Sequence, residues 1–268
     1  MHNINLPRTP FIPAIGLLAF VLSGIAAQAQ TPTGDDTQDR NNKNHITIGA
    51  GAAYAPVFEG GDKYRLLPVP VIDASWGPFF ADLRNGVGIN AIDTKVVTVG
   101  ASVVYLPGYR RRDVPNGIGK LSDSIGGRGF VALRASGFVA TLGVTQGLTG
   151  GTKGLIADAS LAYPITVTSR LMLIPSIGTT WADKKHNDRY FGVNTEQSLA
   201  SGLPSFHAGS GFKDVSGILT ASYRLTDHVD LSTSGGVTSL LGNVQDSPLV
   251  LHKTQPFGFA AVSYRFGL

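Results

Sequence analysis

Hydrophobic and polar residues alternate along most of the chain after residue 45. The segment at 97–105 places Val97, Val99 and Val103 on one face of an extended strand and small or polar residues on the other. The same period of two recurs near residues 46, 138, 155, 215 and 229. Segments of about ten residues with this alternation are typical of transmembrane barrel strands. The pattern predicts an all-β protein, a transmembrane antiparallel β-barrel of about twelve strands over residues 45–268.

A soluble β-sandwich would also show a period of two. Such a sandwich would need bulky Ile, Val and Phe on its inner face, whereas the faces of these strands depend on Ala and Gly. The composition therefore favours the barrel.

The connections between strands are predicted to alternate in length. Short links fall near 75–78, 92–95, 135–137, 164–170 and 225–229, and longer ones near 55–63, 106–126, 147–153, 183–212 and 241–256. Bacterial outer-membrane barrels have short periplasmic turns and longer extracellular loops. One short hairpin at Asn85 and Gly86 interrupts the alternation where a long link is due.

The alternation continues to the last residue in FGFAAVSYRFGL. Tyr264, Phe266 and Leu268 share the apolar face of this segment. We expect it to be the barrel-closing strand that pairs with the first strand, because an unpaired edge in lipid leaves backbone groups without partners. The ending resembles the sorting signal of outer-membrane barrels, with Leu268 where Phe is usual.

Two predicted strands contain prolines, which cannot donate a hydrogen bond to a neighbouring strand. Pro68 and Pro70 lie in LLPVPVIDASW, and Pro175 lies in LMLIPSIGTTW. We expect a bulge or a strand end at each place.

The first 44 residues differ from the rest. Residues 1–29 combine Arg8, an apolar core and the small residues Ala27 and Ala29, as in a secretory signal peptide. Pro13 makes an uncleaved membrane helix a poorer interpretation. Residues 30–44 lack aliphatic side chains and are expected to be a flexible periplasmic leader. The predicted location is the outer membrane of a Gram-negative cell.

Composition agrees with a lipid-facing barrel. Charged residues make up 15% of the chain, below the roughly 25% of soluble domains. No later stretch reaches about 18 apolar residues, which excludes a helical inner-membrane protein. The net charge of +4 is spread without a dense basic patch, so no nucleic-acid partner is expected.

Catalytic motifs are mostly missing from the sequence. The chain has no Cys, its histidines lack the i, i+4 spacing of metal ligands, and no phosphate-binding glycine loop occurs. We expect no metal and no cofactor. A Ser-His-Asp set could be drawn in one Gly-rich polar segment, where such residues also occur by chance, from Ser205, His207, Ser210 and Asp214. We expect the protein not to be an enzyme.

Two sets of arginines are candidates for binding. Arg110, Arg111 and Arg112 lie in a predicted outer loop, where they could hold lipopolysaccharide phosphates or form an ordinary solvated tip. A second set falls on predicted inner faces, with Asp73 and Asp158 as candidate partners, and comprises Arg128, Arg134 and Arg224. These charges either pair across a filled lumen or line a narrow pore.

The segment RYFGVNTEQSLASGLPSFHAGSGFKDV resembles the MltA-interacting protein (MipA/OmpV) family of outer-membrane proteins. The matching positions are Tyr190, Phe191, Gly192, Val193, Gly202, Leu203, Pro204, Gly209 and Gly211. YAPVFEGGDKYRLLPVPVID and the final VSYRF extend the resemblance over almost the whole chain after residue 45. The segment KKHNDRYFGV departs from the run usual in the family.

The resemblance implies an outer-membrane barrel without catalytic residues. It also implies a scaffold that holds a lytic murein transglycosylase together with a penicillin-binding protein, and other members resemble porin-like, osmotic-response or adhesive surface proteins. The aromatic side chains of the motif loop either fold over the barrel mouth or belong to an ordinary packed outer loop.

Overall fold

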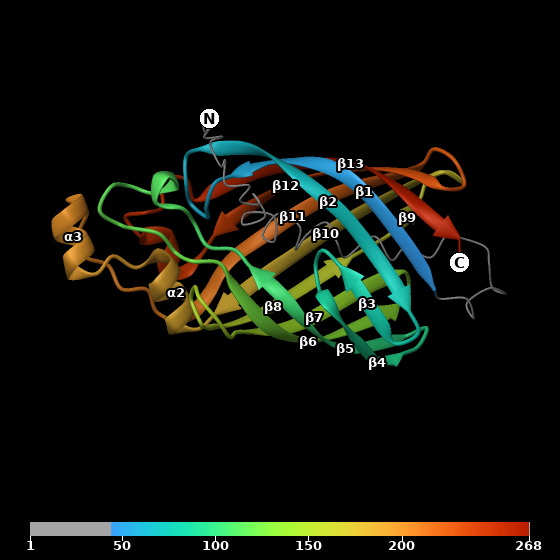
Figure 1. Cartoon of the computed structure of the whole chain (residues 1–268), viewed down its shortest axis with the longest axis horizontal. Coiled ribbons are helices and arrows are strands. Elements are labelled where there is room, and N and C mark those ends of the chain that lie inside the picture. The colour runs from blue at the N-terminus through green and yellow to red at the C-terminus, as the bar shows by residue number, and fades with distance from the viewer. Residues whose placement is uncertain (1–43, 268) are drawn as a thin grey trace, which may run out of the picture.

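The alternating segments form β-strands that pair with their neighbours along the chain (Figure 1). A computed structural model describes residues 44–267. The predicted signal peptide and all but Asn44 of the predicted leader lie outside the described residues. The strands are β1 (His45–Pro56), β2 (Tyr64–Trp76), β3 (Phe79–Asp82), β4 (Gly86–Asp93), β5 (Val97–Leu106), β6 (Ser124–Ala135), β7 (Phe138–Gly147), β8 (Leu155–Ala162), β9 (Ile165–Thr166), β10 (Leu171–Ala182), β11 (Gly211–Arg224), β12 (Val229–Leu240) and β13 (Thr254–Gly267).

Antiparallel pairing closes these strands into one barrel. β13 pairs with both β12 and β1, and β10 pairs with β11 at the other end of the strand order. β8 and the two-residue β9 lie one after the other along the same side of β10, so they occupy one position in the wall. The result is a closed barrel of 12 strands, which confirms the predicted fold class.

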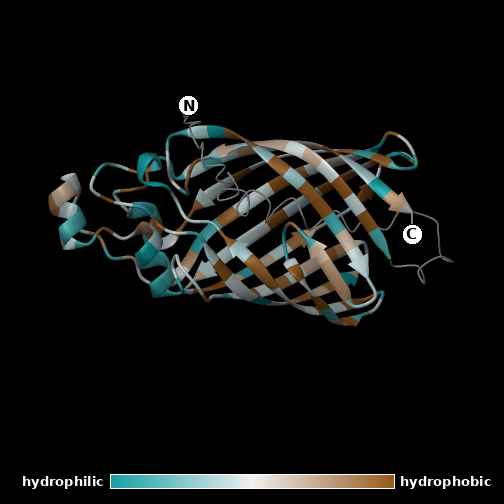
Figure 2. Cartoon of the chain, viewed as in Figure 1, coloured by the Kyte–Doolittle hydropathy of each residue, from teal (hydrophilic) through white to brown (hydrophobic). Residues whose placement is uncertain are grey.

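Side chains divide by face as the sequence pattern predicts. Val103 of β5 points outward and is 54% exposed, whereas its neighbour Val104 points inward and is 7% exposed. Figure 2 shows the resulting alternation of apolar and polar residues along the strands. Within residues 44–267 no helix is long and apolar enough to cross a membrane.

The two ends of the barrel differ. The long-loop end carries the connections 57–63, 107–123, 148–154, 183–210 and 241–253. These loops contain the helices α2 (Lys184–Phe191) and α3 (Thr195–Ser201) and the 3-10 turns η2 (Arg111–Asp113) and η3 (Gly242–Asp246). The short-turn end carries the connections 77–78, 94–96, 136–137 and 225–228 and the turn that contains β9. The predicted alternation of link lengths is confirmed.

The first and last described strands lie side by side and reach the short-turn end (Figure 1). His45 is paired with Gly267 and Ile48 with Tyr264. Tyr264 and Phe266 are exposed on the outer face, while Leu268 lies outside the described residues. The last described strand, β13, is therefore part of the wall.

The prolines mark irregular pairing. Pro175 of β10 lies opposite the break between β8 and β9, where its carbonyl accepts a hydrogen bond from Tyr163 N–H. Pro68 and Pro70 interrupt nothing, because the pairing of β2 with β1 runs without a shift. The expected bulge or strand end in β2 is thus wrong. On its other side, β2 pairs with β3 only over Asp73–Trp76.

Part of the barrel interior is an apolar core. Phe257 and Phe259 of β13 pack with Leu67 and Val69 of β2 and with Ile218 of β11. These residues form an apolar cluster inside the barrel next to β1 and β2.

Candidate functional site

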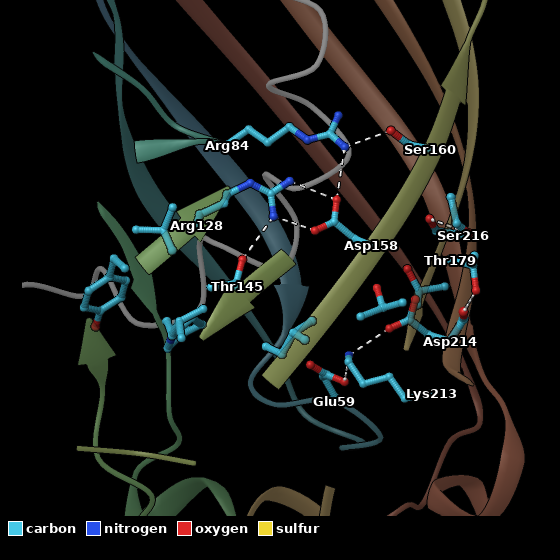
Figure 3. A pocket seen from close by; sticks show the side chains of 18 of the residues that line it. Glu59, Arg84, Arg128, Thr145, Asp158, Ser160, Thr179, Lys213, Asp214 and Ser216 are labelled. Carbon is cyan, nitrogen blue, oxygen red and sulfur yellow. Dashed lines mark hydrogen bonds and ion pairs between the residues drawn. The ribbon is translucent and has the colours of Figure 1, made fainter. Parts of the chain in front are cut away.

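A cavity of about 360 Å³ lies in the barrel lumen below the long-loop end. Its lining joins apolar side chains, among them Val104, Leu106 and Phe257, to two groups of buried charges. Figure 3 shows that the side chains of each group point toward one another, from strands, the loop 57–63 and the turn between β3 and β4. We call them the arginine group (Arg84, Arg128 and Asp158) and the lysine group (Glu59, Lys213 and Asp214).

The arginine group has two cations around one carboxylate. Arg128 of β6 contacts Asp158 of β8 with both terminal nitrogens, at 2.5 and 2.9 Å. Arg84 donates to Ser160 Oγ at 2.8 Å and lies 3.7 Å from Asp158 (Figure 3). Of the candidate partners left open by the sequence, Asp158 pairs with Arg128, from a strand two positions away in the wall. Asp73 instead lies 3.3 Å from His45 Nε2, and Arg134 donates to Thr98.

Arg84 is held in the lumen by the tight turn between β3 and β4. The Asp82 carboxylate accepts hydrogen bonds from the backbone N–H groups of Arg84 and Asn85, at 2.8 and 2.5 Å. Gly86 follows with φ of 77°, and a Cβ there would lie 2.0 Å from the Val103 carbonyl oxygen. Only glycine fits this position. The short hairpin noted at Asn85 and Gly86 therefore carries Arg84 inward.

The lysine group lies directly below the loops. Lys213 Nζ contacts Glu59 at 2.7 Å and Asp214 at 2.8 Å, and none of the three side chains is more than 9% exposed. Burial raises the pKa of Glu59, and the Lys213 ammonium partly opposes this rise. The group ties the loop 57–63 to the start of β11.

A β-bulge places two consecutive charged residues inside the barrel. Thr180 pairs with Asp214 and Trp181 with Phe212, so Lys213 is the extra residue of β11. An extra residue breaks the alternation of faces. Lys213 and Asp214 are both buried for this reason.

The loops form a second apolar core over the barrel mouth, which we call the loop cap. Tyr190 and Phe191 of α2 pack with Phe58 and Tyr109, which come from two other loops. The remaining members are Val57, Val114, Ile118, Val193, Ala208, Leu240, Val244 and Leu249. Burial raises the pKa of Tyr109 to about 12. The described loops thus pack together across the long-loop end.

The motif residues hold the loop 183–210 in this cap. Val193 exchanges two backbone hydrogen bonds with Phe206, at 2.8 and 2.9 Å. Gly192 ends α2, Gly202 ends α3 with φ of 74°, and Leu203 packs against the cap. Gly209 accepts a hydrogen bond from Asn187 Nδ2 at 2.8 Å, Pro204 is exposed, and Gly211 begins β11. Of the two interpretations of this loop, the structure favours folding over the mouth.

The three consecutive arginines lie at the long-loop end around η2. Arg111 and Arg112 are exposed, and Arg110 is half-buried. The following Asp113 is buried and forms a 2.6 Å ion pair with Arg65 of β2. The ion pair anchors the loop and leaves the arginine side chains at its surface.

The structure separates the residues that could be drawn as a catalytic set. Ser205 Oγ donates to the Val193 carbonyl, His207 lies 3.2 Å from Asp188, and Asp214 belongs to the lysine group. Ser210 is exposed. Within residues 44–267, no three His, Asp or Glu side chains are placed to hold a metal ion.

Sequence reasoning missed Glu59, Lys213 and Arg84. The signal for Arg84 was the unexpectedly short Asn85 and Gly86 hairpin. Lys213 had no such signal, because the bulge that turns it inward depends on the register with β10. Glu59 lies in the loop 57–63 and is buried by contacts with Tyr190 and Lys213, which lie 131 and 154 residues away in the sequence.

These features define an outer-membrane β-barrel with a capped mouth and a charged internal cavity. The family model "MltA-interacting protein MipA" matches residues 48–266. The chain belongs to this family.

Two of the three relatives described next are named as outer membrane proteins. The MltA-interacting protein of Escherichia coli K12 is 24% identical over 229 residues, which cover 82% of this chain and 90% of that protein. The 24 kDa outer membrane protein of Pasteurella multocida is 22% identical and covers 78% and 85%. The outer membrane protein YiaT of E. coli K12 is 32% identical over 114 residues, and the match spans 42% of this chain and 45% of YiaT.

Among solved structures, the KdgM porin has a TM-score of 0.43 at 10% identity, covering 83% of this chain and all of that one. The NanC porin has a TM-score of 0.45 at 8% identity, covering 82% and 98%.

Proposed function

We propose that this protein is a non-enzymatic scaffold that holds peptidoglycan-remodelling enzymes at the inner face of the outer membrane. The proposed partners are a lytic murein transglycosylase and a penicillin-binding protein. The observation that carries the proposal is the loop cap, because loops packed over the mouth oppose a wide, open channel. The name of the E. coli relative, MltA-interacting protein, supports an interaction role for the family.

The interior supports the same proposal. A porin needs a continuous polar channel, whereas this lumen holds an apolar core beside β1 and β2 and charge groups that pair with one another. The dispersed Ser, His and Asp side chains give no support to lipid hydrolysis.

The partner enzymes would dock at the short-turn end, which faces the periplasm in this class of barrel. Its turns are short, with Trp76, Phe79 and Val96 exposed beside them. Stable interfaces bury roughly 800 Å² on each partner, more than a few tips offer. We therefore propose that the leader 30–44 adds contact area by ordering on the partner.

The exposed arginines of the loop 107–123 give the opposite end a separate proposed contact. Guanidinium groups match phosphate oxygens, and the side chains of Arg111 and Arg112 are exposed at the long-loop end, with Arg112 Nε 3.9 Å from Asp113. Replacing both by Gln is expected to weaken co-purification of lipopolysaccharide, measured per mole of folded barrel. Unchanged co-purification would contradict this contact.

Affinity capture from solubilised envelopes tests the scaffold. The tagged protein is compared with a variant that lacks residues 30–44, and bound proteins are identified by mass spectrometry. The matched control is Leu199→Ala, at an 84% exposed position on α3 at the opposite end. We expect a murein enzyme with the intact protein and the control, and less of it without the leader. Capture of no murein enzyme would contradict the scaffold, and large steady conductance in planar bilayers would favour a channel.

A further inference from the structure

The barrel wall is incomplete between β2 and β5. Only the hairpin of β3 and β4 lies between them, and β3 pairs with β2 over Asp73–Trp76. Within the described chain, no strand pairs with β2 residues 64–72 on that side, which we call the unpaired edge. At 3.3 Å per residue this edge is roughly 30 Å long. Across from it, Val104–Leu106 of β5 extend beyond the last residue paired with β4.

The unpaired edge contains two prolines, which need no hydrogen-bond acceptor for their backbone nitrogens. In an antiparallel strand, successive residues direct their backbone groups to alternate sides. The Lys63 carbonyl accepts from Val57 N–H, and Gly77 N–H donates to Asn44, so the odd-numbered residues of β2 face β1. Pro68 and Pro70 therefore direct their ring nitrogens toward the unpaired edge. Prolines at an edge remove donors and prevent the addition of another strand.

The cavity reaches the β3–β4 hairpin and the β5 side of this region, and its lining residues do not include any of β2. Its lining includes Leu83 and Arg84 from the tip of the β3–β4 hairpin and Val104 and Leu106 from the free end of β5. The outward side chains beside it, Leu66 and Val103, are large, apolar and exposed. The Arg65–Asp113 ion pair crosses from β2 to the loop 107–123 and bounds the region on the long-loop side.

We propose that this region is a lateral opening through which a single-chain amphiphile with an anionic head group passes from the membrane into the lumen. The alkyl chain lies along Leu83, Val104 and Leu106, and the head group binds Arg84. The inference is independent of the scaffold role, which concerns the opposite end.

The size and the lining select this ligand. A cavity of about 360 Å³ is at the small end of ligand pockets, which suits one alkyl chain better than a two-chain phospholipid. The arginine group has two cations that share one carboxylate, that of Asp158, whereas the lysine group has one cation between two carboxylates. The nearby Asp82 carboxylate also lines the cavity, where it accepts from the backbone N–H groups of Arg84 and Asn85. The two contacts of Arg84 with Ser160 and Asp158 both use its Nη2. The other donors of its guanidinium can bind a carboxylate or phosphate oxygen.

Photocrosslinking in vesicles tests the opening. The full chain is reconstituted in phosphatidylethanolamine vesicles with a trace of diazirine-bearing palmitic acid, and labelled residues are mapped by mass spectrometry. We expect label on inward residues, Leu83 and Val104, in addition to lipid-facing residues such as Val103. Label confined to outward residues would overturn the proposal.

Closing the cavity gives a matched comparison. Val104→Trp fills the cavity, whereas Val103→Trp places the same side chain on the lipid face of the same strand. We expect about tenfold less label on Leu83 in the first variant and no change in the second. If Val104→Trp does not fold, Val104→Cys provides the only thiol of the chain, which is alkylated with benzylmaleimide after folding. Equal inward labelling with the cavity closed would overturn the opening.

The head group is tested with Arg84→Gln. Palmitic acid is compared with its methyl ester, which has the same chain and no charge. Wild type is expected to favour the acid about tenfold for inward label, the ratio for one charge-assisted hydrogen bond. Arg84→Gln is expected to label equally with both. If wild type itself does not distinguish acid from ester, the anionic head group is wrong.

Discussion

The lysine group and the arginine group are built from the same kinds of residue and differ in what surrounds them. The lysine group places one cation between two carboxylates, all at most 9% exposed, where the loop 57–63 meets β11. The arginine group places two cations around Asp158, which is 22% exposed, and both groups line the cavity. The comparison indicates that the lysine group joins a loop to the wall, and that the arginine group, with its partly exposed carboxylate, can exchange its contacts with a ligand.

The largest expected loss of stability comes from breaking the lysine group. Lys213→Met leaves the carboxylates of Glu59 and Asp214 buried side by side without a cation. Breaking a buried ion pair costs about 3–5 kcal/mol. We expect a loss of that size in the free energy of unfolding, measured by urea unfolding in lipid vesicles with tryptophan fluorescence.

The control for this prediction neutralises the whole group with Glu59→Gln, Lys213→Met and Asp214→Asn. Replacing a buried charge group by neutral residues of similar volume is often nearly neutral, so most of the stability should return. A loss below about 1 kcal/mol in Lys213→Met alone would show that the group is not a structural lock.

The loop cap itself comes next. Phe191 is almost fully buried in the cap, whereas Leu199 lies exposed on α3 in the same loop. Phe191→Ala should cost the cap about 3–4 kcal/mol through the cavity it leaves, and Leu199→Ala should cost almost nothing. Limited proteolysis of the loop 183–210 in folded barrels measures the difference. Equal cleavage of the two variants would contradict a packed cap.

A smaller loss of stability is expected when the arginine group is broken. Asp158→Asn removes the shared carboxylate of two guanidinium groups, and the partial exposure of the site limits the loss to about 2 kcal/mol. The matched control is Asp246→Asn, which is 62% exposed and has its partner Lys253 3.3 Å away, at the surface where a pair contributes less than about 1 kcal/mol. Both are measured by the same urea unfolding. If the two variants lose equal stability, the arginine group contributes no more to stability than a surface ion pair.

Sequence pattern predicted the wall of the barrel far better than its contents. A period of two fixes which residues face lipid, and the alternation of link lengths identifies the two ends, because both are local properties of the chain. The lysine group depends on a bulge and on a loop 154 residues away in sequence, so no local pattern contains it. Arg128 and Asp158 were found because each keeps the regular alternation of its own strand.

The prolines of β2 show where pattern reasoning stopped. Pro68 and Pro70 indicated a strand that could not pair fully, and a bulge or strand end was the expected solution. The structure instead leaves one side of β2 unpaired over residues 64–72 and keeps the pairing with β1 intact. Whether β2 has a bulge or an unpaired side depends on how short β3 is. The sequence of its four residues, Phe79–Asp82, does not determine that length.

The smallest effect is a pH dependence that separates the cap from the surface. His186 of α2 is buried, lies 2.9 Å from Thr152 Oγ1 and stacks on Tyr190. Burial, together with the nearby Lys213 ammonium, lowers the pKa of His186 to about 3. Between pH 6.5 and 3 the unfolded state therefore binds the proton that the folded state excludes, so the stability of the cap falls as the pH falls below 6.5. Between pH 7 and 5.5 the expected loss is about 1 kcal/mol.

Glu59 acts in the opposite direction at lower pH. Because its folded-state pKa is raised above 4.5, protonation near that value favours the folded cap and masks part of the His186 effect. The difference between wild type and His186→Gln cancels the Glu59 contribution, since both proteins contain it. We expect this difference in the stability of the cap to vary with pH between 7 and 5.5. It is measured by limited proteolysis of the loop 183–210. A difference between the two proteins that does not vary with pH would show that the cap does not exclude the proton.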